Sequence, residues 1–331
     1  MMLPDFTDKI FTIKNQEEFN KTARDVFFYQ LENNSVYREY VNLICKDISL
    51  VKNFKQIPFL PVEFFKTKTI VTGNGIEQKI FRSSGTSGQD QSKHLVTDLL
   101  IYEKSAVESF EMFYGSLSEF TILALLPSYL ERDNSSLVWM TNLFINKSKF
   151  KKDCGFFQDD YSELVQRLKK LSKEKSKKIL LLGVSFALLD LAERIDFPLN
   201  HIIVMETGGM KGRRKEIIRE ELHLMLCDRL KVKKIHSEYG MTELLTQSYS
   251  LGDGIYKCPP WKKVIIREMN DPLGFAQDGR SGGINVIDLA NINSCSFIAT
   301  QDVGKCFADG SFEVTGRFDY SDTRGCNLMI S

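Results

Sequence analysis

Long apolar runs, paired cysteines and a charge imbalance are all missing from this sequence, and each absence excludes a class of protein. No apolar stretch approaches the roughly 18 residues that a membrane helix needs. The N-terminus, MMLPDFTDKIFTIKN, lacks the basic and apolar segments of a secretory signal. The formal net charge is only +1, so neither nucleic acid nor an acidic membrane is expected as the principal partner. We expect a cytoplasmic protein without a membrane span, acting on a small molecule or another protein.

Cysteine and histidine are scarce and scattered. The seven cysteines include no CxxC pair and the four histidines are isolated, so neither a disulfide framework nor a Cys/His metal site is predicted. Such thiols are typical of a reducing compartment. A divalent ion held by carboxylate and phosphate oxygens remains open.

The 331 residues are 43% hydrophobic and 26% charged, and they fall into three segments with different sequence patterns. Residues 1–78 contain apolar positions at helical spacing and predict an N-terminal helical cap. In residues 79–250 short apolar runs such as FTILALL, KILLLGV, HIIVME and KKIH alternate with amphipathic stretches, which predicts βα units and a largely parallel sheet. Residues 251–331 hold short alternating runs, typical of a β-rich portion of the same large domain. The predicted fold class is α/β.

A polar loop follows the short apolar run KIF at residues 79–81. The stretch FRSSGTSGQDQSK (residues 81–93) combines hydroxyl side chains with two glycines and ends in a lysine. Glycine lets backbone amides approach a ligand closely, so the loop suits phosphate oxygens; the alternative is a surface turn. A Walker loop is excluded because Gln89 follows Gly88, and a dinucleotide fingerprint because TGNGIE lacks the third glycine. The candidate ligands are Ser83, Ser84, Gly85, Thr86, Ser87, Gly88 and Lys93.

Other polar side chains follow expected strands. HSEYGMTELL (residues 236–245) comes after KKIH, and Glu243 is a candidate ligand for a hard cation such as Mg²⁺. Asp302 in ATQDVG and Arg317 in VTGRFD suit ribose hydroxyls and phosphate. Singly, each is equally compatible with a polar loop or a surface salt bridge. Together, in this order and spacing, the motifs are much more specific than any one of them.

The set resembles the adenylate-forming superfamily of acyl-CoA synthetases, peptide-synthetase adenylation domains and luciferases, over roughly residues 80 to 326. The resemblance implies the large N-terminal domain of such an enzyme, with ATP and Mg²⁺ as cofactors and with acyl-AMP and pyrophosphate as products. It implies that residues 83–88 and Lys93 wrap the ATP phosphates. The remaining implied nucleotide and metal contacts come from Tyr239, Gly240, Thr242, Glu243 (on Mg²⁺), Asp302 (on ribose), Arg317 and, beside adenine, Gly208 and Gly209 of METGG.

One departure concerns the C-terminus. Most of the superfamily continue after GRxD with a mobile domain that carries a catalytic lysine, whereas here only Tyr320 to Ser331 follow. Either the chain is a fragment or it belongs to a branch that ends here. It resembles such a branch, the acyl-protein synthetases of bacterial bioluminescence, also called long-chain-fatty-acid luciferin-component ligases. That family adenylates a fatty acid and passes the acyl group to its own cysteine, from which a partner reductase collects it.

In this chain Cys326 of DTRGCNLMIS stands at the acceptor position, so the implied catalytic residues are Cys326, Lys93 and Thr242. A cysteine on a short tail that follows glycine can act as a thiolate nucleophile. The alternative is a buried thiol in a last strand, CNLMI.

Three other functions stay open. An acyl-CoA or acyl-carrier-protein ligase of the phenylacetate-CoA ligase type would take its acceptor thiol from a partner. GVSFA (residues 183–187) is similar to a nucleophile elbow, which would make Ser185 the nucleophile of a hydrolase, although we expect Ser185 to cap a helix near the acyl pocket. A degenerate adenylate-binding subunit or a scaffold is the third.

Overall fold

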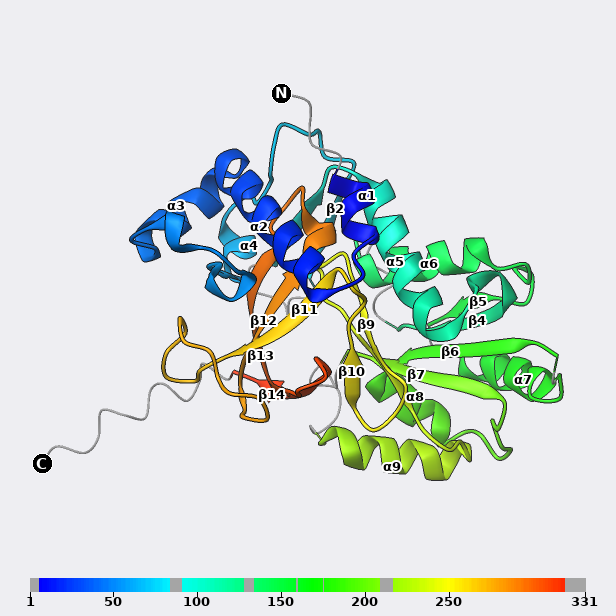
Figure 1. Ribbon diagram of the computed structural model, residues 1–331. Helices are drawn as coiled ribbons and strands as arrows, with labels where there is room; N and C mark the ends of the chain where they lie inside the picture. Colours follow the sequence, from blue (N-terminus) through cyan, green and yellow to red (C-terminus); the bar gives the residue numbers. More distant parts are fainter. Residues whose placement is uncertain are drawn as a thin grey trace, which may run out of the picture.

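One extended sheet organises the protein (Figure 1). The computed structural model describes residues 6–83, 91–127, 134–158, 160–174, 176–208 and 217–318. The strands of the sheet follow the order β11-β12-β13-β14-β10-β9-β8-β7-β6-β4-β5, with β1 beside β13, and β2 pairs with β3 in a separate hairpin. The strands are β1 Leu60–Pro61, β2 Lys79–Arg82, β3 Lys93–Val96, β4 Phe120–Leu125, β5 Gly155–Phe157, β6 Lys178–Val184, β7 Ile202–Thr207, β8 His236–Tyr239, β9 Ser248–Ser250, β10 Ile255–Lys257, β11 Lys262–Arg267, β12 Gly282–Asp288, β13 Phe297–Cys306 and β14 Phe312–Arg317.

Half of this sheet is parallel. Strands β5, β4, β6, β7 and β8 run in one direction, and the pairs from β8 through β9 and β10 to β14 are antiparallel. Every residue of β4 is buried, and so is all of β6 after Lys178. Parallel strands covered on both faces have this near-continuous apolar sequence. The predicted α/β fold is therefore confirmed.

Helices cover both faces of the parallel half (Figure 1). Helices α5 and α6 share one apolar cluster with alternate residues of β6, and α7, α8 and α9 share a second with the residues between them. Asp98 caps α5 by accepting from the backbone amide of Leu100, and Gly115 ends it at a φ of 83°. The helices are α1 Phe6–Phe11, α2 Gln16–Asn33, α3 Ser35–Ile44, α4 Phe64–Thr67, α5 Leu99–Tyr114, α6 Ser136–Lys147, α7 Tyr161–Leu171, α8 Ser185–Ala192 and α9 Arg219–Leu230.

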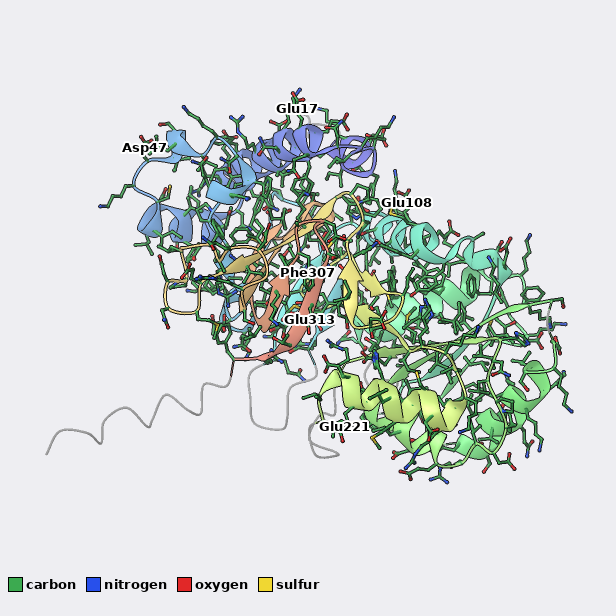
Figure 2. All side chains as sticks on the ribbon, turned by 60° about the horizontal axis from the view of Figure 1, so that its bottom comes forward. Glu17, Asp47, Glu108, Glu221, Phe307 and Glu313 are labelled. Atoms are coloured by element: carbon green, nitrogen blue, oxygen red, sulfur yellow. The ribbon has the colours of Figure 1, made fainter. Side chains whose placement is uncertain are left out.

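The N-terminal helices pack on the antiparallel half. Figure 2 shows Glu17 of α2 and Glu221 of α9 at opposite ends of the molecule. The buried amide of Gln30 on α2 donates to the carbonyl of Ile292 at 2.8 Å and accepts from the Ser296 amide at 3.0 Å. Phe297 stacks on Tyr37 of α3. These contacts join the N-terminal helices and the antiparallel strands in one core.

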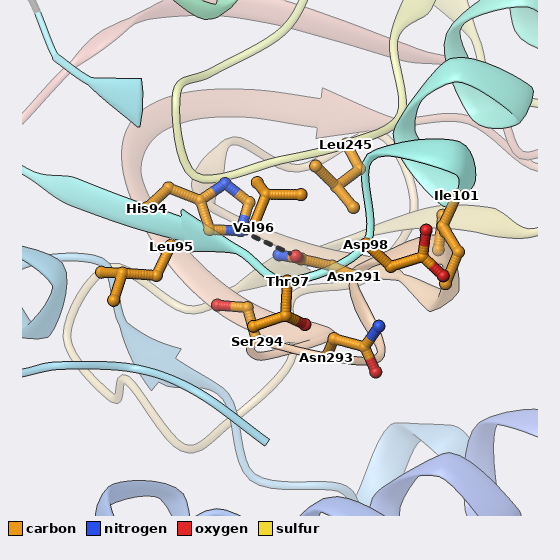
Figure 3. A pocket seen from close by; sticks show the side chains of 11 residues that line it. His94, Leu95, Val96, Thr97, Asp98, Ile101, Leu245, Asn291, Asn293 and Ser294 are labelled. Carbon is orange, nitrogen blue, oxygen red and sulfur yellow. Dashed lines mark hydrogen bonds between the residues drawn. The ribbon is translucent and has the colours of Figure 1, made fainter. Parts of the chain in front are cut away.

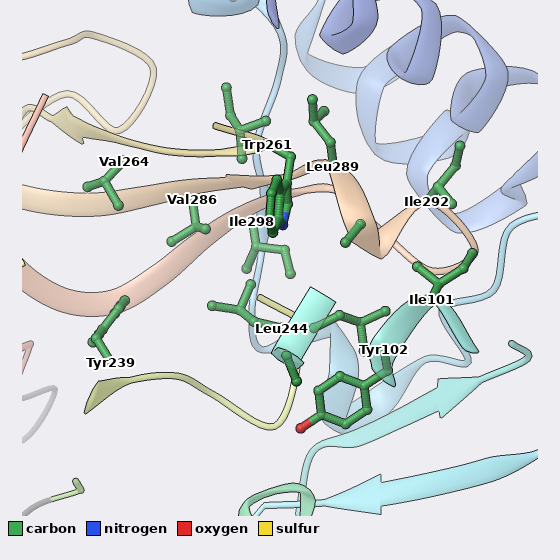
Figure 4. Close-up of a cluster of buried hydrophobic side chains, with 14 of the residues drawn as sticks. Ile101, Tyr102, Tyr239, Leu244, Trp261, Val264, Val286, Leu289, Ile292 and Ile298 are labelled. Carbon is green, nitrogen blue, oxygen red and sulfur yellow. The ribbon is translucent and has the colours of Figure 1, made fainter. Parts of the chain in front are cut away.

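That core also anchors the segment after β8. Leu244 is 1% exposed and lies between Tyr102 of α5 and the side chains of Trp261 and Ile298 (Figure 4). Burying a leucine of this kind contributes about 2 kcal/mol. The buried side chain of Leu244 consequently fixes the C-terminal end of the turn that begins at Gly240.

One strand differs from its prediction. The strand expected over KKIH begins only at His236 and continues through Tyr239. The reason is register: Met205 to Thr207 of β7 pair with residues 236–238, while Lys233 and Lys234 are exposed before the strand begins. Glu238 and Tyr239 are therefore strand residues.

Candidate active site

Polar residues from separate segments gather near the ends of β7 and β8. Side-chain contacts join these ends to β13 and β14, although β9 and β10 lie between them in the sheet. Open α/β sheets bind ligands at this edge. Gly208 follows β7 with a φ of 70°, in the left-handed region that favours glycine. The predicted residues Ser84, Gly85, Thr86, Ser87, Gly88, Gly209 and Cys326 lie outside the described residues.

Asp302 is the centre of one part of the site. The Tyr239 hydroxyl donates to Asp302 Oδ2 at 2.8 Å, and Arg317 Nε lies 4.0 Å from Asp302 Oδ1. Burial raises the pKa of Asp302, while Tyr239 and Arg317 oppose the rise. The Arg317 side chain is 63% exposed and that of Asp302 19%. A held carboxylate beside an accessible guanidinium suits a ribose next to a phosphate.

The hairpin β2–β3 carries the stems of the polar loop. The Ser83 amide donates to the Ser92 carbonyl at 3.1 Å, and the Ser92 amide donates to Ser83 Oγ at 2.9 Å. These bonds bring the two ends of the loop together. Lys93 follows at once as the exposed first residue of β3.

Thr242 and Glu243 lie against this hairpin. The ring of His94 contacts the Thr242 carbonyl, with 2.8 Å between Nδ1 and the oxygen. Glu243 is 5% exposed, and the Ser92 hydroxyl interacts with its carboxyl group. Burial raises the pKa of Glu243 despite that contact. A carboxyl group whose ionised form is destabilised by burial, and which contacts Ser92, fits a hard divalent cation, since Mg²⁺ is usually held by one or two carboxylates and substrate phosphates.

Gly240 lies directly against a buried side chain. A Cβ atom added there would clash with Glu238 Oε1, so a larger residue would displace that carboxyl group. Glycine thus lets the backbone pass directly over the buried carboxyl group of Glu238.

With this geometry established, comparison with known families decides the identification. The family model described as acyl-protein synthetase, LuxE, matches residues 10–331. The chain belongs to the acyl-protein synthetase family. A comparison with curated protein sequences gave no match.

Solved structures share the fold of this acyl-protein synthetase. An open conformation of 2-hydroxyisobutyryl-CoA ligase in complex with 2-HIB-AMP and CoA has a TM-score of 0.69 at 12% identity, covering 93% of this chain and 72% of that one. The same ligase in the thioesterification state has a TM-score of 0.67 at 13% identity, covering 97% and 73%. ATP-bound MatB from Rhodopseudomonas palustris has a TM-score of 0.52 at 16% identity, covering 72% of this chain and 47% of that one. Family and fold together support an acyl-adenylate-forming ligase.

Among the helices that the structure describes, none combines the length and the apolar character needed to cross a bilayer.

Ser185 of this acyl-protein synthetase does not face a histidine. Its hydroxyl donates to Glu206 Oε2 at 3.0 Å and lies 3.2 Å from the Gly208 carbonyl, while His223 is 3.6 Å from the other oxygen of Glu206. A serine nucleophile needs a base within hydrogen-bonding reach, and here a carboxylate separates the two. The expected helix cap is also wrong, because Val184 is the N-cap residue and Ser185 already belongs to α8.

Arg219 is a residue that the sequence did not indicate. It begins α9, donates to the Val314 carbonyl of β14 at 2.6 Å and lies 3.4 Å from Glu206 of β7. It therefore joins the strand before Gly208 to the strand that carries Arg317. No sequence motif around Arg219 indicates this role.

Glu238 offers a test of the site's electrostatics. Burial raises its pKa to about 7 from 4.5, although Thr207 Oγ1 donates to its carboxyl group at 2.5 Å and Lys262 also opposes the rise. Because the folded protein holds this proton more tightly than the unfolded chain, the carboxyl group costs stability as the pH rises from about 4.5 to 7. Glutamine keeps an acceptor for Thr207 and does not titrate.

We therefore expect Glu238→Gln to stabilise the protein more at pH 8 than at pH 5, by on the order of 2 to 3 kcal/mol in the free energy of unfolding. Chemical unfolding of both proteins at the two pH values measures this difference. The exposed Glu221→Gln is the matched control. The same pH dependence in wild type and Glu238→Gln would show that Glu238 is not the buried group that titrates.

Proposed function

We propose that this acyl-protein synthetase activates a long-chain fatty acid as acyl-AMP and transfers the acyl group to the thiol of Cys326. The observation that carries the proposal is the meeting of the Lys93 hairpin, the Thr242–Glu243 turn and the Asp302–Arg317 pair at one sheet edge. These groups come from distant parts of the chain. Adenylation needs three groups in one place: a carboxylate that holds Mg²⁺, a loop that binds phosphates and a carboxylate that binds the ribose.

In the first step, an oxygen of the fatty-acid carboxylate attacks the α-phosphorus of ATP. The new O–P bond forms as the bond to the bridging oxygen breaks, and pyrophosphate leaves. In this proposal Lys93 and the loop would hold the leaving phosphates, which the exposure of Lys93 and the closed stems at Ser83 and Ser92 support. Thr242 would contact the α-phosphate, and Asp302 with Arg317 would orient the ribose. The contribution of the protein is position and charge neutralisation.

Glu243 is the residue that would hold Mg²⁺. The ion would neutralise charge on the phosphates when bound. The buried carboxyl group with its raised pKa supports this role, because a cation would replace the proton that burial favours.

In the second step, the thiolate of Cys326 attacks the acyl carbonyl of acyl-AMP. A C–S bond forms, the bond between carbonyl carbon and phosphate oxygen breaks, and AMP leaves with the electron pair. The thiol proton goes to solvent. The thioester would then pass to a partner, either a fatty-acyl reductase or a carrier protein. The proposal also includes a cytoplasmic location, a division of the chain into three parts at residues 78 and 250, and a fatty acid as the substrate.

A second candidate keeps the adenylation and changes the acceptor. The structural relative 2-hydroxyisobutyryl-CoA ligase was solved with CoA, and it covers nearly the whole chain at a TM-score of 0.69. In that case coenzyme A or a carrier protein would supply the thiol.

Intact-protein mass spectrometry tests the two. The protein is incubated with ATP, Mg²⁺ and a mixture of saturated fatty acids, then treated with neutral hydroxylamine, which cleaves thioesters. We expect an acyl adduct that hydroxylamine removes and that maps to Cys326. AMP release that depends on added coenzyme A or carrier protein, without an adduct, would favour the second candidate. No AMP under either condition would refute both.

A further inference from the structure

The hairpin that carries Lys93 has no backbone ladder to the rest of the site. Among the described strands, β2 and β3 pair only with each other. Phe81 fastens the hairpin to α5 by an edge contact with Tyr102 at 5.5 Å. The Arg82 amide also donates to the Asn134 carbonyl at 2.9 Å, and the Ser92 hydroxyl contacts the Glu243 carboxyl group. Apolar packing is not directional, so the distance between Lys93 and the turn at Thr242 depends on hydrogen bonds of this kind.

His94 supplies a directional contact. It follows Lys93 in β3, and because side chains of a strand alternate, Lys93 is exposed while His94 is buried, at 1% exposure. Its Nδ1 lies 2.8 Å from the Thr242 carbonyl, and its Nε2 lies 3.0 Å from Asn291 Oδ1 (Figure 3). The ring therefore lies between the hairpin, the turn and the segment after β12.

The orientation of Asn291 is set by other bonds. Its Nδ2 donates to the carbonyls of Glu243 and Cys295, each at 2.8 Å. Turning the amide over would bring its oxygen against two carbonyl oxygens, so Oδ1 stays directed at His94. Both ring nitrogens consequently face oxygen acceptors.

We propose that His94 is a positioning residue for adenylation, which sets the spacing between Lys93 and the Thr242–Glu243 turn through a hydrogen bond from Nδ1–H to the Thr242 carbonyl. The inference rests on the proposed function. Burial lowers the pKa of His94, so the neutral ring carries one N–H and donates to one oxygen at a time. The shorter contact is the one to Thr242, and only that bond reaches the turn directly.

Two amide substitutions separate the ring nitrogens. The side-chain nitrogen of asparagine can occupy the place of Nδ1, and that of glutamine the place of Nε2. In ATP–pyrophosphate exchange with the fatty acid identified by mass spectrometry, we expect His94→Gln and His94→Ala to lower kcat by about tenfold or more. His94→Asn should restore kcat to within about threefold of wild type. If His94 acts only through the spacing of Lys93 and the turn, the KM for the fatty acid should stay the same in all three.

Two controls exclude a merely structural effect. Phe65→Leu loosens the packing on the same ring, from a centroid distance of 5.8 Å, but removes no hydrogen bond, and His201→Gln changes an exposed histidine. Both should keep the wild-type kcat. Equal kcat values for His94→Asn and His94→Gln, or a Phe65→Leu protein as slow as His94→Ala, would overturn the role of His94. A wild-type protein without exchange would overturn the proposed function and this inference together.

Discussion

Replacing Glu243 by alanine is expected to abolish ATP–pyrophosphate exchange. In the proposed site Glu243 is the carboxylate that would hold Mg²⁺, and loss of the charge stabilisation that such an ion supplies costs several kcal/mol, a factor of at least about a hundred in rate. The side chain is 5% exposed and contacts the Ser92 hydroxyl. Exchange of labelled pyrophosphate into ATP, measured over a range of Mg²⁺ concentrations, records the loss.

Glu243→Gln is the matched variant, because it keeps the shape and the contact with Ser92 but carries no charge. Burial raises the pKa of Glu243, so its ionised form costs stability above the ordinary pKa of a glutamate. The glutamine variant should thus be at least as stable as wild type at pH 8 and still inactive. An inactive but stable Glu243→Gln protein separates loss of the metal ligand from misfolding. Exchange at the wild-type rate in either variant would refute the metal role.

Replacing Cys326 by serine should remove the acyl label and leave adenylation unchanged. A serine hydroxyl ionises far less readily than a thiol and lacks an activating base in this proposal, so transfer should stop after acyl-AMP. Burial raises the pKa of Cys258, Cys295 and Cys306, which makes those thiols poor competitors. Cys326 is the carrier that the proposal names.

Intact mass and exchange should be measured on the same Cys326→Ser preparation. We expect wild-type exchange, no hydroxylamine-sensitive adduct and slow accumulation of bound acyl-AMP. Cys45→Ser, which changes a half-buried thiol near the N-terminal helices, should keep the adduct. A label that survives in Cys326→Ser would move the acceptor to another residue. Loss of exchange as well would mean that Cys326 belongs to the adenylation site.

Much of the fold could be predicted because it depends on local periodicity. Strand β6 is a short apolar run, and the neighbouring helices have apolar residues at helical spacing, so each element could be inferred from its own segment. The segments that bear Tyr239, Asp302 and Arg317 could be found because polar residues near glycine at expected strand ends are typical of ligand sites at a sheet edge. Tyr239 and Arg317 are the last residues of β8 and β14, whereas Asp302 lies inside β13 and not at a strand end as expected. Side-chain contacts nevertheless bring the three residues together.

The contacts between distant segments were decided only by the tertiary structure. The sequence by itself determined an α/β chain with a phosphate-type loop and polar strand ends. It did not reveal that β8 begins at His236, because pairing with β7 selects the register and thereby buries Glu238. Nor did it reveal that His94 meets Asn291, 197 residues away, or that Ser185 donates to Glu206. Local propensity acts within a few residues, whereas register and buried hydrogen bonds depend on which elements pack together.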